Sequence, residues 1–270
     1  MKNLRWVIQG NLIHENDTGQ MQQACEKIGV EYEMVQVIPF SGDLPIFTED
    51  EKTNIYYGGT TFMYNLYYQK NKPVGLFFDE EKFSIENYLN HWGEHMLNHG
   101  AKITTLKEFS AETHDAESIW FIRPDADSKS FDGQTMTFEK IKNWAITFQK
   151  FENVNLDENT KIIVGEPWNI KKEWRLYVVD GKIVTSSMYR KDFRIKKTRE
   201  DIPEEMLKFA EDRIKEYQPA GCFAMDIALC GDAYYIIECG CINSVGFYAC
   251  EIDKFVEAIS NYVLKLETVS

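Results

Sequence analysis

The sequence predicts a mixed fold, with α/β alternation in residues 1–118 and an α+β arrangement in residues 119–270. In the first part, apolar strand-like runs alternate with helix-like segments, which is typical of a parallel sheet. In the second part, Asp180-Gly181 lies between two strand-like runs and favours the positive φ angles of a tight antiparallel hairpin. At 270 residues the chain is long enough for one large domain or two modest ones.

The first part predicts a small βα layer. Asp17 or Thr18 can cap its first helix, Gly29 suits the end of that helix, and Ser84 can cap its last one. The expected elements are a strand at Leu4–Gln9, a helix to about Ile28, strands at Tyr32–Ile38 and Asn54–Tyr57, a helix to about Gln69, an extended piece at Pro73–Phe78 and a helix to about Asn98.

The second part predicts strands that pair as hairpins, with helices between them. Thr137 can cap the first of these helices. The expected elements are strands at Ser118–Ile122, Lys161–Val164, Glu173–Val179, Lys182–Met188, Phe223–Leu229 and Tyr234–Glu238, and helices at Phe138–Phe151, Pro203–Tyr217 and Cys250–Leu266.

Composition excludes several classes of protein. A formal net charge of −13 argues against generic nucleic-acid binding. No apolar run reaches the length of a membrane span, and the N-terminus lacks the pattern of a signal peptide, so we expect a cytoplasmic protein with no membrane partner.

The six cysteines form no C-x-x-C pair, which favours buried free thiols. His91, His95 and His99 have helical spacing, for which a packed or solvated helix face is favoured over a metal site.

A basic island interrupts this acidic composition. Residues 190–199 hold six lysines and arginines and a single acid, Asp192. Such an island is either a solvated loop or a contact for an anionic substrate, and the sequence leaves both readings open.

Acidic and amide side chains gather near two neighbouring C-terminal strands. Asp226 and Glu238 belong to these strands, and Asn243 follows soon after. A carboxylate within an apolar strand is costly to bury without a cation or hydrogen-bond donors. Mg²⁺ prefers such oxygen ligands and would relieve the repulsion between the acids. The alternative is a pair of strand-end acids that face water.

Here the sequence resembles the ATP-grasp superfamily, from about residue 119 to the C-terminus. Phe121-Ile122-Arg123-Pro124 resembles the start of the loop that covers the phosphates. Residues 164–168 are similar to the hinge that holds adenine and ribose, and residues 173–184 resemble the acidic-x-Arg hairpin that Arg190 closes. Asp226, Glu238 and Asn243 match the metal-binding residues.

More narrowly, the chain resembles the R-to-K clade of phage and bacterial ATP-grasp proteins, which is named for its arginine and lysine. Arg123, Lys129 and residues 242–248 carry this likeness. That clade has been predicted to act in RNA repair or in peptide-type ligation. Two departures stand out: Gly240 occupies the Asn position of the common Glu-x-Asn pattern, and residues 125–133 replace the glycine-rich phosphate loop.

The resemblance implies an ATP-grasp fold preceded by a small βα pre-ATP-grasp domain at residues 1–118. It divides the ATP-grasp domain at residues 119–270 into a lid-like subdomain, 119–165, and a C-terminal subdomain, 166–270. It also implies that Mg²⁺ binds Asp226, Glu238 and Asn243. The implied nucleotide-binding residues are Arg123, Lys129, Val164, Glu166, Trp168, Glu173, Arg175 and Arg190.

The implied activity is an ATP-dependent ligation in which Lys129, Arg175 and Arg190 are the catalytic residues. A carboxylate substrate attacks the γ-phosphate of ATP, and an amine or another nucleophile displaces phosphate from the acylphosphate. Three alternatives stay open. They are an ATP-grasp enzyme acting on RNA ends, a nucleotidyl-transfer ligase whose Lys-x-Asp-Gly motif would be one residue too long at Lys129, and a non-catalytic ATP-binding module.

Overall fold

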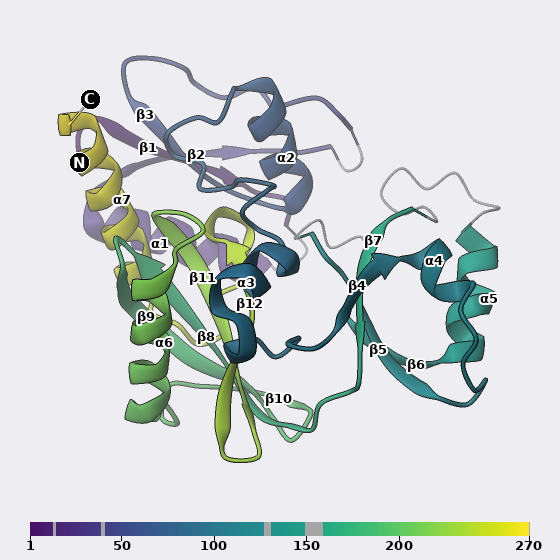
Figure 1. The fold of residues 1–270 in the computed structure, drawn as a ribbon. Helices are drawn as coiled ribbons and strands as arrows, with labels where there is room; N and C mark the ends of the chain where they lie inside the picture. Colours follow the sequence, from purple (N-terminus) through teal and green to yellow (C-terminus); the bar gives the residue numbers. More distant parts are fainter. Residues whose placement is uncertain (13–14, 39–40, 127–130, 149–158, 270) are drawn as a thin grey trace.

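The strands of the computed structural model form three sheets in the residues that it describes, which are 1–12, 15–38, 41–126, 131–148 and 159–269. The first sheet is formed within residues 4–57 and the other two within residues 102–241 (Figure 1). Such a combination of parallel and antiparallel sheets with packed helices confirms the predicted mixed fold.

The N-terminal sheet is parallel and has the strand order β2-β1-β3. Its strands are β1 (Leu4–Gln9), β2 (Glu31–Val35) and β3 (Thr53–Tyr57), with the helices α1 (Glu15–Ile28) and α2 (Thr60–Gln69). Every residue of β1 is buried because it is the central strand. The C-terminal helix α7 (Ile252–Val269) packs against α1, which brings the two ends of the chain close together (Figure 1).

The second sheet is antiparallel and has the order β10-β9-β8-β11-β12. Its strands are β8 (Ile170–Val179), β9 (Lys182–Lys191), β10 (Arg194–Thr198), β11 (Cys222–Cys230) and β12 (Ala233–Cys241). Asp180 and Gly181 have φ angles of 50° and 73°, so the predicted tight turn joins β8 to β9. The helix α6 (Glu204–Glu216) packs its apolar residues into the core on one side of this sheet.

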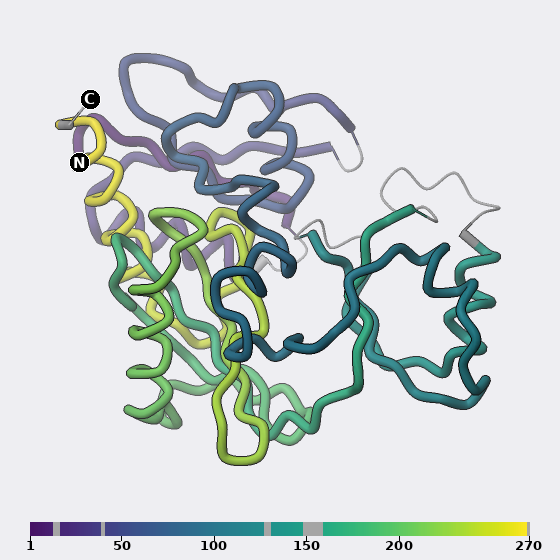
Figure 2. Tube along the Cα trace, viewed as in Figure 1, coloured from purple at the N-terminus to yellow at the C-terminus, as the bar shows by residue number. Residues whose placement is uncertain are grey.

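The third sheet is antiparallel and has the order β4-β7-β5-β6. Its strands are β4 (Lys102–Thr105), β5 (Ile119–Pro124), β6 (Gln134–Thr137) and β7 (Lys161–Gly165). The helices α4 (Leu106–Ser110) and α5 (Phe138–Phe148) share a small core with one face of the sheet. This unit, called the lid below, stands to one side of the other two sheets (Figure 2).

Several elements differ from the predictions. The piece at Pro73–Phe78 forms a single bridge to β3 at Gly75 instead of a strand. The helix that Ser84 caps, α3 (Ile85–Trp92), ends early because Gly93 adopts a φ angle of 48°, and a short 3-10 turn (Gly93–His95) follows. A second 3-10 turn (Ile242–Ser244) follows β12.

The predicted boundary at residue 118 stays a prediction. In the structure β4 pairs with β7, so the lid sheet takes one strand from the segment assigned to the N-terminal part.

The cysteines and the lengths of the helices test two of the expectations from composition. All six cysteines are free and buried. Burial raises the pKa of the Cys25 thiol to about 12 and that of Cys250 to about 11, so these thiols are poor nucleophiles and metal ligands. In the described part of the chain, no helix combines the length and the apolar character that crossing a bilayer requires.

Candidate active site

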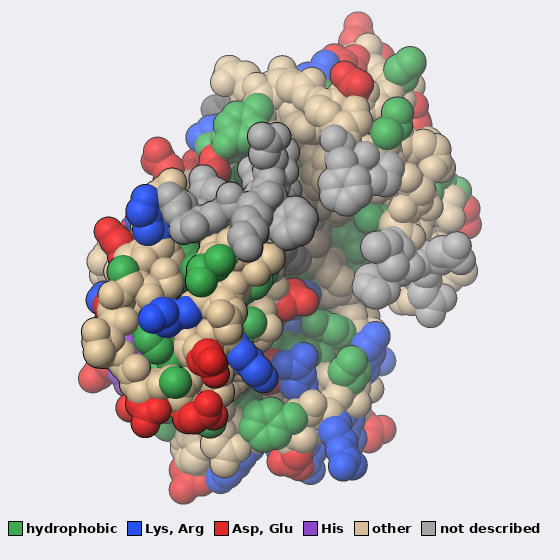
Figure 3. Space-filling view, turned by 90° about the vertical axis from the view of Figure 1, so that its right-hand side faces the viewer, with side chains coloured by type: hydrophobic (Ala, Val, Ile, Leu, Met, Phe, Trp, Pro, Cys, Tyr) green, Lys and Arg blue, Asp and Glu red, His purple; other side chains and the backbone are tan. Residues whose placement is uncertain are grey.

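A cleft of about 1010 Å³ lies between the lid and the five-stranded sheet. Its walls come from β5 and the segment before β6 on the lid side, from β8, β9, β11 and β12 on the other side, and from residues 244–248. The hollow is visible in the space-filling view of Figure 3. Seven predicted site residues line the cleft, namely Arg123, Trp168, Glu173, Arg175, Arg190, Asp226 and Glu238.

Strand register brings the central charges together. Arg175 on β8 is the Cα partner of Asp226 on β11, which in turn is the partner of Glu238 on β12. Directly opposed residues on antiparallel strands project from the same face of a sheet. These three side chains therefore form a row across the sheet on the cleft side, although they lie up to 63 residues apart in the sequence.

Arg175 holds Asp226 in a two-pronged ion pair. Its Nε donates to Asp226 Oδ1 at 2.8 Å, and its Nη2 donates to Oδ2 at 2.7 Å. The remaining nitrogen, Nη1, donates to the carbonyl of Gly246 at 3.2 Å. Burial lowers the pKa of Arg175, but the charge of Asp226 outweighs this effect, so the pKa lies well above its ordinary value. With all three nitrogens engaged, Arg175 is suited to positioning Asp226.

Two other arginines approach the row from outside it. Arg123, on β5 of the lid, reaches across the cleft and pairs with Glu238 of the facing sheet. Its Nε is buried and has no hydrogen-bond partner in the described part of the structure. Arg190, on β9, pairs with the buried Glu173 at 3.2 Å and keeps 44% of its side chain exposed. Both guanidinium groups can therefore reach an anion in the cleft.

An aromatic pair closes one end of the cleft. Tyr189 and Tyr248 stack with their ring centroids 4.5 Å apart, and the guanidinium carbon of Arg175 lies 4.9 Å from the Tyr248 ring. Tyr248 has a φ angle of 55°, which is unfavourable for a bulky residue. The contacts of residues 244–248 stabilise this conformation. Within this segment the Gly246 carbonyl accepts from Arg175 and, at 2.7 Å, from the Tyr177 hydroxyl.

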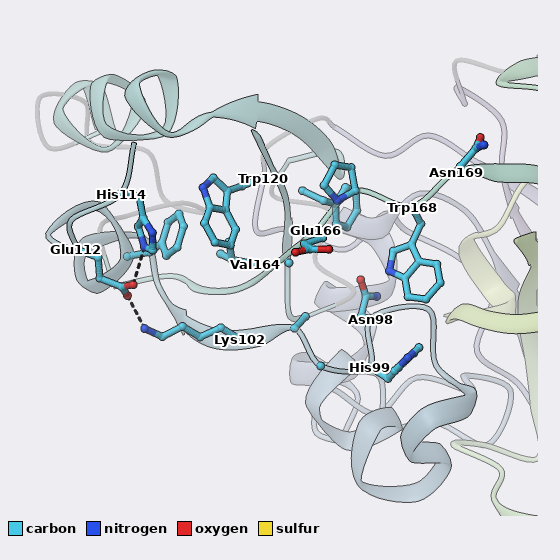
Figure 4. Close-up of a pocket in the computed structure, with 16 residues that line it drawn as sticks. Asn98, His99, Lys102, Glu112, His114, Trp120, Val164, Glu166, Trp168 and Asn169 are labelled. Atoms are coloured by element: carbon cyan, nitrogen blue, oxygen red, sulfur yellow. Dashed lines mark hydrogen bonds and ion pairs between the residues drawn. The ribbon is translucent and has the colours of Figure 1, made fainter. Parts of the chain in front are cut away.

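A second cavity, of about 590 Å³, continues the cleft along the hinge between β7 and β8. Three predicted nucleotide-binding residues line it, namely Val164, Glu166 and Trp168. Figure 4 shows Glu166 and Trp168 near Asn98, whereas His114 and Glu112 lie at the far end of the cavity. Trp168 also lines the larger cleft, so the two cavities meet at the hinge.

Asn98 is a candidate that sequence reasoning missed. It lines both cavities, is only 4% exposed, and its Nδ2 has no hydrogen-bond partner in the described part of the structure. A buried amide donor without a partner is costly unless something else accepts its hydrogen bond. Its position after α3, in a segment with no recognisable motif, left no signal in the sequence.

The structure does not bring Asn243 to the cleft. Its Nδ2 donates to the carbonyls of Tyr56 at 2.6 Å and Gly75 at 2.9 Å, and its Oδ1 accepts from the backbone of Phe77 at 2.8 Å. Asn243 is 2% exposed and joins the end of β12 to the N-terminal sheet. Lys129 lies outside the described residues, so its role stays a prediction.

These contacts predict a structural effect for Asn243. We expect Asn243→Ala to lower the free energy of unfolding by about 2–4 kcal/mol, because it leaves buried backbone groups without partners. Asn243→Asp should destabilise the chain as well, since a carboxylate cannot donate to the two carbonyls. Urea unfolding of both variants measures the effect. A stable Asn243→Asp variant with unchanged or tighter metal binding would instead support the metal-ligand prediction.

The fold is that of solved ATP-grasp ligases. A D-alanine–D-alanine ligase from Bacillus anthracis superposes with a TM-score of 0.58 at 12% identity, covering 99% of each chain. An ATP-grasp RimK domain protein from Sphaerobacter thermophilus DSM 20745 gives 0.58 at 11% identity, covering 96% of this chain and 99% of that one. The ATP-grasp ligase PsnB, complexed with a phosphomimetic variant of its minimal precursor, Mg and ADP, gives 0.55 at 10% identity over 97% and 98%.

Sequence comparisons define the family. No curated protein matches the chain significantly. The family model described as ATP-grasp domain, R2K clade family 2, matches residues 100–258, which is more than half of the chain and includes the whole lid and every charged residue of the row. The chain therefore belongs to the R2K clade of ATP-grasp proteins.

Proposed function

We propose that this protein is an ATP-dependent ligase that activates a carboxylate as an acylphosphate and joins it to an amine or another nucleophile, forming a carbon–nitrogen bond in the first case. The observation that carries the proposal is the meeting of Asp226 and Glu238 with Arg123 and Arg190 in one cleft between two sheets. The solved structures with this fold support it, because they include ligases and a ligase complexed with Mg and ADP. We place the reaction in the cytoplasm, where ATP is made and used.

The two strand carboxylates suit Mg²⁺. Among the described residues, no group of three or more His, Cys, Asp or Glu gathers that could hold a metal alone. Mg²⁺ commonly binds through one or two carboxylates, with substrate phosphates and water as the other ligands. Asp226 and Glu238, opposed on adjacent strands, fit this pattern. When bound, Mg²⁺ offsets the negative charge of the phosphate oxygens during transfer.

The arginines would bind the triphosphate. In the structure Arg123 pairs with Glu238 and Arg190 pairs with Glu173. If Glu238 held a metal ion instead of Arg123, this guanidinium would be available to a phosphate, for which it is well suited. Arg175 keeps Asp226 in place throughout, because its nitrogens are already engaged. Lys129 is proposed as a further phosphate contact, and Glu166 and Trp168 as contacts for ribose and adenine.

The proposed reaction has two steps. An oxygen of the substrate carboxylate attacks the γ-phosphorus, the bond from that phosphorus to the bridging oxygen breaks, and ADP leaves. The amine then attacks the acyl carbon, phosphate leaves, and the amine loses a proton. The chain contributes mainly by orienting the reactants and by stabilising charge on the transferring phosphoryl group through Arg123 and Arg190.

Trapping of the acylphosphate tests this proposal. The protein is incubated with ATP, Mg²⁺ and a panel of amino acids and peptides as carboxylate donors, with hydroxylamine as a general nucleophile. We expect ADP, phosphate and a hydroxamate in equal amounts with at least one donor. Formation of AMP or of an adenylylated lysine would instead indicate nucleotidyl transfer. Tight ATP binding with no turnover across the panel would indicate a non-catalytic module.

A further inference from the structure

The strand β10 leaves one edge of the five-stranded sheet open. It is the outermost strand, next to β9, and residues 192–197 are all exposed. Apart from its pairing with β9, no backbone–backbone hydrogen bond joins residues 194–198 to any other described residue. An edge strand presents a row of backbone donors and acceptors with which another extended chain can pair.

The same strand carries cations that the chain does not neutralise. Arg194 and Lys196 form no ion pair with any described residue, and neither does Lys191 at the adjoining end of β9. Their neighbours differ, because Arg190 pairs with Glu173 and Arg199 pairs with Glu251 at 2.8 Å. In a chain with a formal net charge of −13, unpaired cations on one strand mark a site for a negatively charged partner.

The open strand adjoins the cleft. Arg190, Phe193 and Lys197 line the cleft, and Lys197 Nζ lies 5.6 Å from the centroid of the Tyr248 ring. Two apolar side chains beside the cations are unusually exposed, Phe193 at 67% and Ile195 at 74%. Figure 3 shows several Lys and Arg side chains gathered below the hollow of this face. A chain that pairs with β10 would therefore pass the mouth of the cleft.

We infer that β10 docks an acidic peptide segment in extended conformation, which adds a strand to the sheet and delivers a carboxylate to the cleft. The inference rests on the proposed function, since it names the substrate class of that site. A peptide uses all three features of the strand, pairing its backbone with the open edge, its acids with the cations and its apolar side chains with Phe193 and Ile195. A nucleic acid would use the cations, but its sugar–phosphate backbone lacks the amide groups that pair with a strand edge. The net negative charge of the protein also opposes the binding of a long polyanion.

Peptide binding to the docking strand tests the inference. The probe is a fluorescein-labelled peptide of about ten residues that alternates Glu and Val, long enough to cover one strand. Fluorescence anisotropy at low ionic strength measures its affinity. We expect the double variant Arg194→Glu/Lys196→Glu to weaken binding by about tenfold, and alternate N-methylation of the peptide to weaken it similarly, because the methyl groups block pairing with the strand edge.

Matched controls separate docking from general charge and from catalysis. The variant Lys208→Glu/Lys215→Glu makes the same change in net charge on α6, and we expect it to bind the peptide normally. ATP affinity should be unchanged in Arg194→Glu/Lys196→Glu, whose substituted residues do not line the cleft. Normal ATP turnover without peptide docking would overturn this inference alone, whereas docking without turnover would overturn the proposed function alone.

Three results would overturn the inference. They are equal affinity of the wild type and Arg194→Glu/Lys196→Glu for the peptide, equal affinity for the N-methylated peptide, and tighter binding of a single-stranded RNA of the same charge. The last result would identify a nucleic acid as the partner.

Discussion

We expect Glu238→Gln to lower ATP-dependent product formation by about 10³-fold while the protein keeps its fold. Glutamine has nearly the size of glutamate but lacks the charge that a metal ligand at this position needs. Glu238 is opposite Asp226 in the β11–β12 ladder, so its loss removes half of the carboxylate pair proposed to hold Mg²⁺. The reaction then proceeds without the charge compensation that the phosphoryl transfer requires.

The fold should tolerate this change because Glu238 is partly exposed, at 29% of its side chain. Glutamine also keeps an oxygen that can accept from Arg123, so we expect a loss of about 1–2 kcal/mol in the free energy of unfolding. The hydroxamate assay measures turnover, and thermal unfolding checks stability. Glu216→Gln is a matched control, since Glu216 also pairs with an arginine, Arg213, but lies on α6 away from the cleft. Turnover within tenfold of the wild type in Glu238→Gln would refute the metal assignment.

The affinity of Glu238→Gln for ATP provides a second measurement, because it depends on Arg123. Because it pairs with Glu238 across the cleft, Arg123 links the lid to the proposed metal site. In Glu238→Gln the guanidinium loses its charged partner and can bind a phosphate without competition. We therefore expect ATP without metal to bind this variant at least as well as the wild type, although turnover is lost. Loss of both binding and turnover would indicate a disturbed cleft.

The central sheet of the site could be predicted from the sequence because its signals are local. The Asp180-Gly181 turn fixes the β8–β9 hairpin, and acids inside apolar strands draw attention to Asp226 and Glu238. The strand ladder then sets which residues face one another, since register determines the face of every side chain. A prediction of these strands thus brought Asp226 and Glu238 to the cleft, and their roles stay predictions.

The strand β10 was missed because its sequence is charged. Residues 194–198 are Arg-Ile-Lys-Lys-Thr, a composition that also suits a solvated loop. Edge strands of natural proteins often carry lysine, which discourages uncontrolled pairing. The two readings offered for the basic island, a loop or a contact surface, did not include a strand. The charged residues that make this strand resemble a loop in the sequence are also the basis of the proposed peptide docking.

The role of Asn243 depends on distant partners. Asn243 contacts the backbone of residues 56, 75 and 77, which are more than 160 positions away in the sequence. Gly75 itself lies close against β3, where a Cβ atom would come within 2.0 Å of the carbonyl oxygen of Asn54. Chain order placed Asn243 near the acids, but the 3-10 turn after β12 directs its side chain to the N-terminal sheet. Such contacts have no local sequence signature.

Asp226→Ala has the largest expected effect on stability, a loss of about 3–5 kcal/mol in the free energy of unfolding. Asp226 is 4% exposed, and the side chain of Arg175 is 12% exposed. Alanine leaves the Arg175 guanidinium buried without a counter-charge and without the acceptors of two hydrogen bonds. The cost arises mainly from this uncompensated charge. Loss of activity in Asp226→Ala would therefore not by itself demonstrate a metal ligand.

A pair of variants separates the two roles of Asp226. Asp226→Asn keeps one oxygen that can accept from Arg175, so it should recover part of the stability but none of the turnover. The double variant Asp226→Leu/Arg175→Met removes both charges and fills the space with apolar groups, and it should be at least as stable as Asp226→Asn. Urea unfolding measures all three. If Asp226→Ala proves as stable as the wild type, Arg175 must find another acceptor, and its assignment as the residue that positions Asp226 is wrong.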